Sequence, residues 1–306
     1  EPLADLADIV SLGEGEEVSI EMFDLYRRHK LSGHFDRQKF LREAADIPGL
    51  YIPSLYEVSY NEDGTISAFT PKDGAPEKIQ KRIIQDMSKV YYPENFVVPI
   101  IEIVHDRAVT EIFRGCIRGC RFCQAGYIYR PNREKDYSTV NAQSRSLCDT
   151  TGYDEVSLSS LSSSDYTELP ELLDNMLNWT EPSKVSISLP SLRIDGFSDE
   201  LTEKLKKVRR GGLTFAPEAG TQRLRDVINK NVTEEEVLST CRTAFNGGWT
   251  NVKLYFMLGL PTETLEDVEG IGALSQKVVD EFYRNPNKPK GKGVNVTSSA
   301  STFVPK

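Results

Sequence analysis

The order of strand-like and helical runs after about residue 108 constrains the fold of this 306-residue chain more than any other feature. Short runs rich in β-branched residues alternate there with helical patterns. We expect six strands, at residues 109–113, 155–159, 184–189, 213–215, 251–257 and 294–298. The helices between them are expected near 139–149, 167–179, 198–209, 221–245 and 264–284. Such alternation requires parallel strands joined by right-handed crossovers.

Six strands are too few to close an eight-stranded barrel, which leaves an open doubly wound sheet or a partial barrel. The prediction is an α/β fold with a partial (β/α)6 TIM-like barrel, chosen partly on a resemblance described below. Ligands of parallel α/β folds bind where strands end. The polar residues expected to converge there are Arg114-Gly115-Cys116, Ser159-Ser160, Ser191 with Arg193, Glu218 and Gly259.

The N-terminal third has a different pattern. Residues 7–17 read as a strand, a glycine turn and a helix start, like the last unit of a Rossmann-like domain. Helices are expected over 20–29, 36–45 and 76–90, with a hairpin of strands 56–60 and 65–69. We therefore expect a Rossmann-like remnant (1–20), a helical and hairpin linker (21–105) and a core (106–306). Because the chain starts without methionine, we expect it to be a piece of a longer protein.

Composition excludes few classes of function. The formal net charge of −9 argues against a broad nucleic-acid-binding surface. No run approaches the roughly 18 apolar residues of a membrane span, and the N-terminus lacks the basic start of a signal peptide. The expected location is the cytoplasm, with no membrane partner.

Three of the five cysteines lie within eight residues, in RGCIRGCRFCQAG. This spacing favours metal ligation over a disulfide framework, whereas Cys148 and Cys241 are interpreted as small buried apolar residues. Cys116, Cys120 and Cys123 form a CxxxCxxC loop directly after the first strand, which can bind three irons of a [4Fe–4S] cube. The fourth iron is then left open to chelate the amino and carboxylate groups of S-adenosylmethionine (SAM).

The cysteine loop has two alternative interpretations. A zinc site would need a fourth ligand, and zinc cysteines more often come as paired CxxC. No second pair exists, and the histidines, His29, His34 and His105, all precede the loop. An iron–sulfur electron-transfer module without SAM chemistry would also need a fourth ligand, and it remains the alternative function.

CxxxCxxC with Phe122 before the third cysteine resembles the signature of the radical SAM superfamily. The similarity extends through SLPSLRIDGF (188–197), LTFAPEAGTQRLRDVINK (213–230) and VKLYFMLGLPTETLEDV (252–268), which resemble cobalamin-linked and methylthiotransferase-like members. EPLADLADIVSLGEGEE is similar to the end of the cobalamin-binding domain that precedes the core in that branch. The closest resemblance is to an uncharacterised bacterial group of cobalamin-binding-domain radical SAM proteins.

The resemblance implies an enzyme that cleaves SAM reductively with a [4Fe–4S] cluster and modifies an unknown substrate, with methyl or methylthio transfer as candidate reactions. It implies cobalamin only for the full-length protein. It also implies an electron donor such as flavodoxin or ferredoxin. The substrate stays open between a small molecule, a protein and RNA.

The resemblance also assigns cofactor contacts. Glu218 would bind the SAM ribose, because a carboxylate can accept hydrogen bonds from two hydroxyls at once. The alternative is an acidic residue at the start of a helix. Ser191 and Arg193 would face the ribose and the carboxylate, the latter suited to the guanidinium fork. The alternative for Arg193 is a solvated strand end.

Two further positions complete the expected cofactor site. Ser159 and Ser160 stand where many members carry a glycine–glycine–glutamate motif that receives the SAM amino group, so this chain departs from the pattern there. Gly259, in GLPTE, is expected near the adenine, or else forms a plain turn. Phe122 is expected to border the cofactor.

Overall fold

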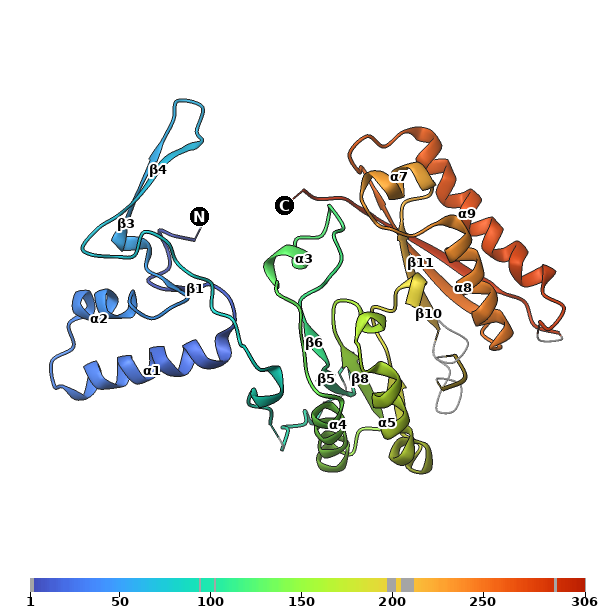
Figure 1. Cartoon of the computed structure of the whole chain (residues 1–306), viewed down its shortest axis with the longest axis horizontal. Coiled ribbons are helices and arrows are strands. Elements are labelled where there is room, and N and C mark those ends of the chain that lie inside the picture. The colour runs from blue at the N-terminus through green and yellow to red at the C-terminus, as the bar shows by residue number, and fades with distance from the viewer. Residues whose placement is uncertain are drawn as a thin grey trace. The chain divides into compact units, whose positions relative to one another are not determined.

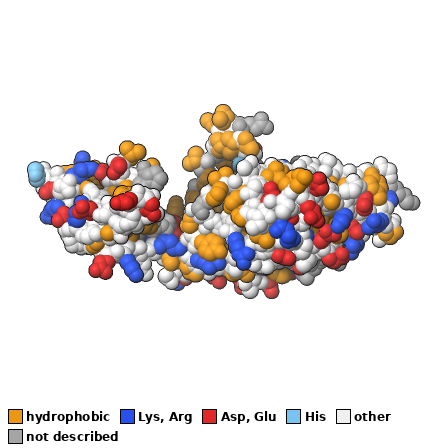
Figure 2. Space-filling model, turned by 90° about the horizontal axis from the view of Figure 1, so that it is seen from above, with side chains coloured by type: hydrophobic (Ala, Val, Ile, Leu, Met, Phe, Trp, Pro, Cys, Tyr) orange, Lys and Arg blue, Asp and Glu red, His pale blue; other side chains and the backbone are white. Residues whose placement is uncertain are grey.

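The structure is a computed structural model that describes residues 3–93, 95–101, 103–196, 202–204, 212–288 and 291–305. The chain divides into two units, Glu1–Tyr91 and Tyr92–Lys306 (Figure 1). Within the described ranges, no helix combines the length and apolar character that a membrane crossing needs. On the face seen in Figure 2, acidic and basic side chains are interspersed.

The first unit packs two helices and short strands around a small core. The core contains Val18, Leu25, Leu41 and Ile52, each at most 3% exposed. Asp36 begins the second helix by accepting the backbone N–H of Lys39 at 3.0 Å. The elements of this unit are β1 (Val10–Ser11), α1 (Gly15–Leu31), α2 (Arg37–Ala44), β2 (Leu50–Tyr51), β3 (Tyr56–Tyr60) and β4 (Ile66–Pro71). The expected helices over 20–29 and 36–45 and the hairpin are confirmed.

The helix expected over 76–90 is wrong. The Arg82 N–H donates to Leu12 O at 2.9 Å and the Glu14 N–H donates to Arg82 O at 3.1 Å, so this segment pairs with the chain after β1. Gly13 permits the approach, since a Cβ there would lie 2.2 Å from Arg82 O. Ile84, 2% exposed, points inward from this extended stretch. The segment therefore buries apolar side chains without being helical, and it ends in a 3-10 turn, Met87–Lys89.

The second unit contains two parallel sheets of three strands each, with orders β5-β8-β9 and β10-β11-β12. A short antiparallel pair, β6 with β7, follows the first strand. The strands are β5 (Ala108–Glu111), β6 (Phe113–Arg114), β7 (Arg133–Glu134), β8 (Glu155–Ser159), β9 (Ser186–Ser188), β10 (Leu213–Glu218), β11 (Asn251–Leu258) and β12 (Asn295–Thr302). The helices are α3 (Ala125–Ile128), α4 (Tyr137–Thr151), α5 (Leu169–Ser183), α7 (Gln222–Val227), α8 (Glu234–Asn246) and α9 (Leu265–Arg284).

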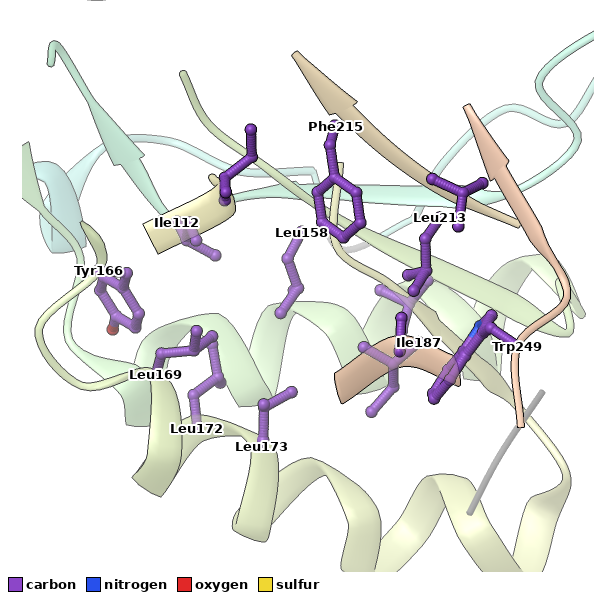
Figure 3. Close-up of a cluster of buried hydrophobic side chains, with 14 of the residues drawn as sticks. Ile112, Leu158, Tyr166, Leu169, Leu172, Leu173, Ile187, Leu213, Phe215 and Trp249 are labelled. Carbon is purple, nitrogen blue, oxygen red and sulfur yellow. The ribbon is translucent and has the colours of Figure 1, made fainter. Parts of the chain in front are cut away.

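One hydrophobic cluster joins the two parallel sheets. Leu158 of β8 and Ile187 of β9 share it with Phe215 of β10 and with Trp249, which precedes β11 (Figure 3). Leu172 of α5 packs into the same cluster. Side-chain packing therefore holds the two sheets together, although no hydrogen bond between β9 and β10 occurs among the described residues.

The expected α/β alternation and all six strand positions are confirmed, with the first strand divided between β5 and β6. Among the described residues the parallel strands form two separate three-stranded sheets, and no closed barrel is present. The helix expected over 221–245 is two helices, because Asn229 and Asn231 take positive φ and Thr233 begins α8 with a capping box. Most of the helix expected near 198–209 lies outside the described residues.

The two isolated cysteines are core residues, as predicted. Cys148 is 7% exposed and Cys241 is fully buried. Burial raises the pKa of Cys148 to about 11 and the pKa of Cys241 to about 12. The thiolate form of each is therefore disfavoured in the folded chain.

Candidate functional site

The three neighbouring cysteines lie in a tight loop between β6 and α3. Gly115 begins it with φ of +97°, and a Cβ there would lie 2.7 Å from Tyr129 O and 2.8 Å from Pro131 O. Only glycine allows this closure. The Arg118 N–H donates to Cys116 Sγ at 3.4 Å, within the loop.

The cysteine loop forms one wall of a pocket of about 250 Å³ in the second unit. The other walls come from the chain after β8, after β9 and around β10. The lining residues are Cys116, Arg118, Cys120, Phe122, Cys123, Leu161, Ser162, Ser191, Leu192, Arg193, Ile194, Ala216, Glu218, Lys230 and Val232. The lining thus combines three thiols, cations, a carboxylate and hydroxyls with apolar side chains.

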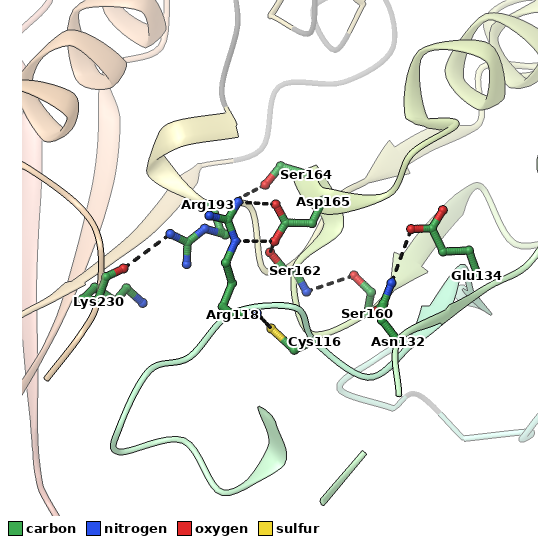
Figure 4. A network of polar contacts seen from close by, with 10 residues as sticks. All are labelled: Cys116, Arg118, Asn132, Glu134, Ser160, Ser162, Ser164, Asp165, Arg193 and Lys230. Atoms are coloured by element: carbon green, nitrogen blue, oxygen red, sulfur yellow. Dashed lines mark hydrogen bonds and ion pairs between the residues drawn. The ribbon is translucent and has the colours of Figure 1, made fainter. Parts of the chain in front are cut away.

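An ion pair borders the pocket on the side of the first sheet. The Arg118 Nε donates to Asp165 Oδ2 at 2.8 Å and its Nη2 contacts Oδ1, while the Ser162 Oγ donates to Oδ2 at 2.6 Å (Figure 4). Burial alone would raise the pKa of Asp165, but Arg118 and Ser162 outweigh it, and the pKa lies below its ordinary value. Asp165 therefore stays ionised and holds Arg118 against the cysteine loop.

A second pair borders the pocket on the side of the second sheet. The register of β10 against β11 shifts between Phe215 and Glu218, and Glu218 takes φ of +71°. Such bulges re-aim a side chain and are common beside active sites. The Lys230 Nζ donates to Glu218 Oε1 at 3.2 Å. Burial nevertheless raises the pKa of Glu218, with Lys230 opposing the shift.

The chain after β9 brings Ser191 and Arg193 to the same pocket. Ser191 takes φ of +60°, and the Arg193 N–H donates to Ser164 Oγ at 3.2 Å. The Arg193 Nη2 donates to Lys230 O at 3.5 Å, which links the two sides of the pocket. Burial raises the pKa of Cys120, and the positive charges of Lys230 and Arg193 oppose this shift.

The family model of the radical SAM superfamily matches residues 110–274, which contain this whole site. The chain belongs to the radical SAM superfamily. A second model, for the N-terminal region of radical SAM proteins, matches residues 1–53. The resemblance read from the cysteine loop and the later strand motifs is therefore confirmed.

Two curated relatives come from Methanocaldococcus jannaschii. An uncharacterized protein is 32% identical over 276 residues, which cover 88% of this chain and 56% of the relative. A methylthiotransferase-like protein is 24% identical over 168 residues, covering 51% of this chain and 36% of the relative. This chain thus spans about half the length of the first relative and about a third of the second.

Solved structures of similar fold include two radical SAM proteins with cobalamin bound. The methyltransferase TsrM from Kitasatospora setae, with cobalamin and a [4Fe–4S] cluster bound, has a TM-score of 0.58 at 15% identity, covering 87% of this chain and 49% of TsrM. OxsB with aqua-cobalamin bound has a TM-score of 0.56 at 12% identity, covering 94% of this chain and 37% of OxsB. At these identities the likeness concerns the fold alone.

The residues present fit the [4Fe–4S] cluster and SAM, the cofactors that the superfamily uses. None of the five cysteines is in a disulfide, and three border one pocket. Among the described residues no three metal-binding side chains gather tightly enough for a single ion. A cube does not require that, because each cysteine binds a different iron.

Of the predicted site residues, the pocket unites Cys116, Cys120, Cys123, Phe122, Ser191, Arg193 and Glu218. The described residues Ser159, Ser160 and Gly259 are not part of its lining. Ser160 folds into a local turn, with its Oγ 3.0 Å from Ser163 Oγ. The Gly259 N–H donates to Glu263 Oε1 at 2.8 Å in the turn after β11.

Sequence reasoning missed three polar residues of the pocket lining, Arg118, Ser162 and Lys230, and also Asp165, which binds Arg118 and Ser162. Arg118 and Ser162 lay one or two positions from residues already singled out, and only their side-chain direction separates them from their neighbours. Lys230 had a weak signal, because it stands between two asparagines, which tolerate turn conformations. Asp165 had none, since its partner Arg118 is 47 residues away.

Proposed function

We propose that this chain is the SAM-cleaving core of a radical SAM enzyme, with Cys116, Cys120 and Cys123 holding a [4Fe–4S] cluster. The observation that carries the proposal is the meeting of these cysteines with Ser191, Arg193 and Glu218 around one pocket. When bound, the cluster supplies the electron for reductive cleavage of SAM. Residues 106–306 form the proposed core, with the two parallel sheets as arcs of a partial barrel.

The side chains around the pocket have distinct proposed roles toward SAM. Glu218 accepts hydrogen bonds from the ribose hydroxyls, because its carboxylate is desolvated and favours hydrogen-bond donors. Arg193 binds the carboxylate of SAM. Ser162 replaces Ser159 and Ser160 as the hydroxyl that meets the amino group, since Ser162 lies on the pocket wall.

Methyl transfer is the proposed reaction class, supported by the likeness to TsrM, whose structure is that of a methyltransferase. Methylthio transfer is the second candidate, supported by the methylthiotransferase-like relative. Cobalamin binding is proposed for the full-length protein, with residues 1–20 as the end of its domain and 21–105 as a linker. An electron donor such as flavodoxin or ferredoxin is the proposed redox partner.

Anaerobic reconstitution with iron and sulfide, followed by dithionite and SAM, tests the first step. We expect 5′-deoxyadenosine or methionine as products, and none from a variant with all three loop cysteines changed to alanine. A cluster that is present but cleaves no SAM, with an EPR signal indifferent to SAM, would favour the electron-transfer alternative. Zinc instead of iron in metal analysis would contradict both.

The substrate is sought with the full-length protein and SAM carrying a deuterated methyl group. The protein is incubated with metabolite, protein and RNA fractions of a cell extract, and each is examined by mass spectrometry. Incorporation of the labelled methyl group identifies the fraction and supports methyl transfer. Incorporation together with one sulfur supports methylthio transfer.

A further inference from the structure

Lys230 is a cation beside the cysteine loop; it ends the motif LTFAPEAGTQRLRDVINK (213–230), but the sequence assigned it no role. Its side chain is 13% exposed, and its Nζ lies 3.2 Å from Glu218 Oε1. The same atom lies 5.7 Å from the ring centroid of Phe122, which stands between Cys120 and Cys123 in the sequence. A nearly buried ammonium therefore lies in the pocket that the cysteines border.

The segment that carries Lys230 is fastened directly to the cysteine loop. The Arg121 N–H donates to Ile228 O at 2.9 Å. The Asn229 Nδ2 donates to Gly119 O at 2.8 Å. These bonds join residues more than a hundred positions apart, so the cysteine loop and Lys230 keep a fixed separation.

The backbone around Lys230 also has an unusual conformation. Asn229 and Asn231, on either side, have φ of +52° and +53°. Such conformations cost about 1 kcal/mol or more each and persist only where surrounding contacts impose them. Contacts of this kind are present, because the Lys230 N–H donates to Arg225 O at 3.0 Å and Lys230 O accepts from Arg193.

We propose that Lys230 is a positioning residue whose fixed ammonium raises the reduction potential of the [4Fe–4S] cluster. The inference rests on the proposed function. Three thiolates make the cluster anionic, and reduction adds a further negative charge, so a fixed cation stabilises the reduced form more than the oxidised form. Arg118 is less suited to this role, because Asp165 binds its guanidinium through two oxygens.

The test is an EPR-monitored redox titration of the anaerobically reconstituted chain without SAM. We expect Lys230→Met to shift the midpoint to more negative potential, with an about tenfold smaller equilibrium constant for reduction, or about 59 mV for one electron. Lys230→Arg keeps the charge and should keep the wild-type potential. Lys253→Met is the control, because Lys253 lies on β11, the neighbour of the strand that carries Glu218, and outside the pocket lining.

Lys230→Met removes the ammonium and also leaves the Glu218 carboxylate without this partner. Glu218→Gln is therefore used as a background in which only the effect of the ammonium on the potential is measured. We expect Glu218→Gln/Lys230→Met to have a more negative potential than Glu218→Gln alone. Equal potentials in both comparisons overturn the inference. If neutral variants fail to load the cluster, full loading of Lys230→Arg assigns the role to the charge, and loss of loading in Lys230→Arg overturns it.

The two proposals fail in different ways. A wild-type chain that takes up no cluster overturns the proposed function and this inference with it. A wild-type chain that loads the cluster and cleaves SAM, but whose potential is indifferent to position 230, overturns this inference alone.

Discussion

Two ion pairs border the pocket, and the pKa of the carboxylate is shifted in opposite directions in the two pairs. Asp165 receives two contacts from Arg118 and one from Ser162, and its pKa is lowered although burial opposes the shift. Glu218 is bonded to Lys230 at 3.2 Å, and burial raises its pKa. The Asp165 carboxylate is therefore used in contacts within the protein, whereas the desolvated oxygens of Glu218 are suited to binding a ligand.

The largest effect is expected from removing a cysteine of the loop that borders the pocket. Cys120→Ala should abolish the cluster and SAM cleavage while leaving both ion pairs and the fold intact, because the Cys120 side chain is only partly buried. Iron and sulfide content after reconstitution measures the loss. Cys148→Ala, which removes a buried thiol of α4, is the control and should load the cluster fully. Equal iron content in both variants would contradict the assignment.

The scaffold behind Glu218 gives the next largest effect. Arg225 is fully buried, and its guanidinium donates to Ala219 O at 3.0 Å and to Val232 O at 3.0 Å. Arg225→Met should leave these carbonyls unsatisfied and lower the free energy of unfolding by about 3 kcal/mol.

Urea denaturation followed by tryptophan fluorescence measures this change, because Trp179 and Trp249 both lie in the second unit. Arg242→Met is the control, since Arg242 is 45% exposed in its ion pair with Glu281 and should cost at most about 1 kcal/mol. Similar costs for the two substitutions would refute the view that Arg225 holds the turn behind Glu218.

Acidification should break the Asp165 pair. Its lowered pKa means that its stabilisation is present above the ordinary value of 3.8 and is lost as pH falls through the folded-state pKa. Asp165→Asn should cost about 2 kcal/mol near neutral pH, and the difference from wild type should shrink below pH 3.8. Urea denaturation across this range measures it, and a difference independent of pH would show that ionisation plays no part.

The smallest expected effect concerns Glu218. Because burial raises its pKa, its ionised form is disfavoured in the folded chain, so Glu218→Gln should change stability by less than Asp165→Asn. It should instead weaken SAM binding about tenfold, or about 1.4 kcal/mol, in the cluster-loaded protein. Calorimetry measures the affinity, with Glu281→Gln on α9 as the control. Unchanged affinity would contradict the proposed ribose contact.

Local patterns predicted much of the fold, and their failures have a common cause. Strand positions, the hairpin and both N-terminal helices follow from periodicity and turn residues near each other in sequence. The segment 76–90 failed because its backbone pairs with residues near Leu12, about 70 positions earlier. The break between α7 and α8 depends on asparagines in positive φ, which periodicity does not register.

The candidate site divides in the same way. Cys116, Cys120 and Cys123, the proposed cluster ligands, were singled out because they are close together in the sequence. Ser160 was expected in the pocket but turns toward Ser163, and Ser162 takes its place, because the direction of a side chain after a strand depends on the turn that follows.

The sequence by itself determined the superfamily, the cofactor loop and the order of strands, since each is written in local spacing. Only the tertiary structure decided the charges around that loop. Asp165 reaches Arg118 across 47 positions, and Lys230 reaches the cysteine loop through Asn229 across 110. Such contacts depend on how sheets and turns pack, so no local pattern encodes them.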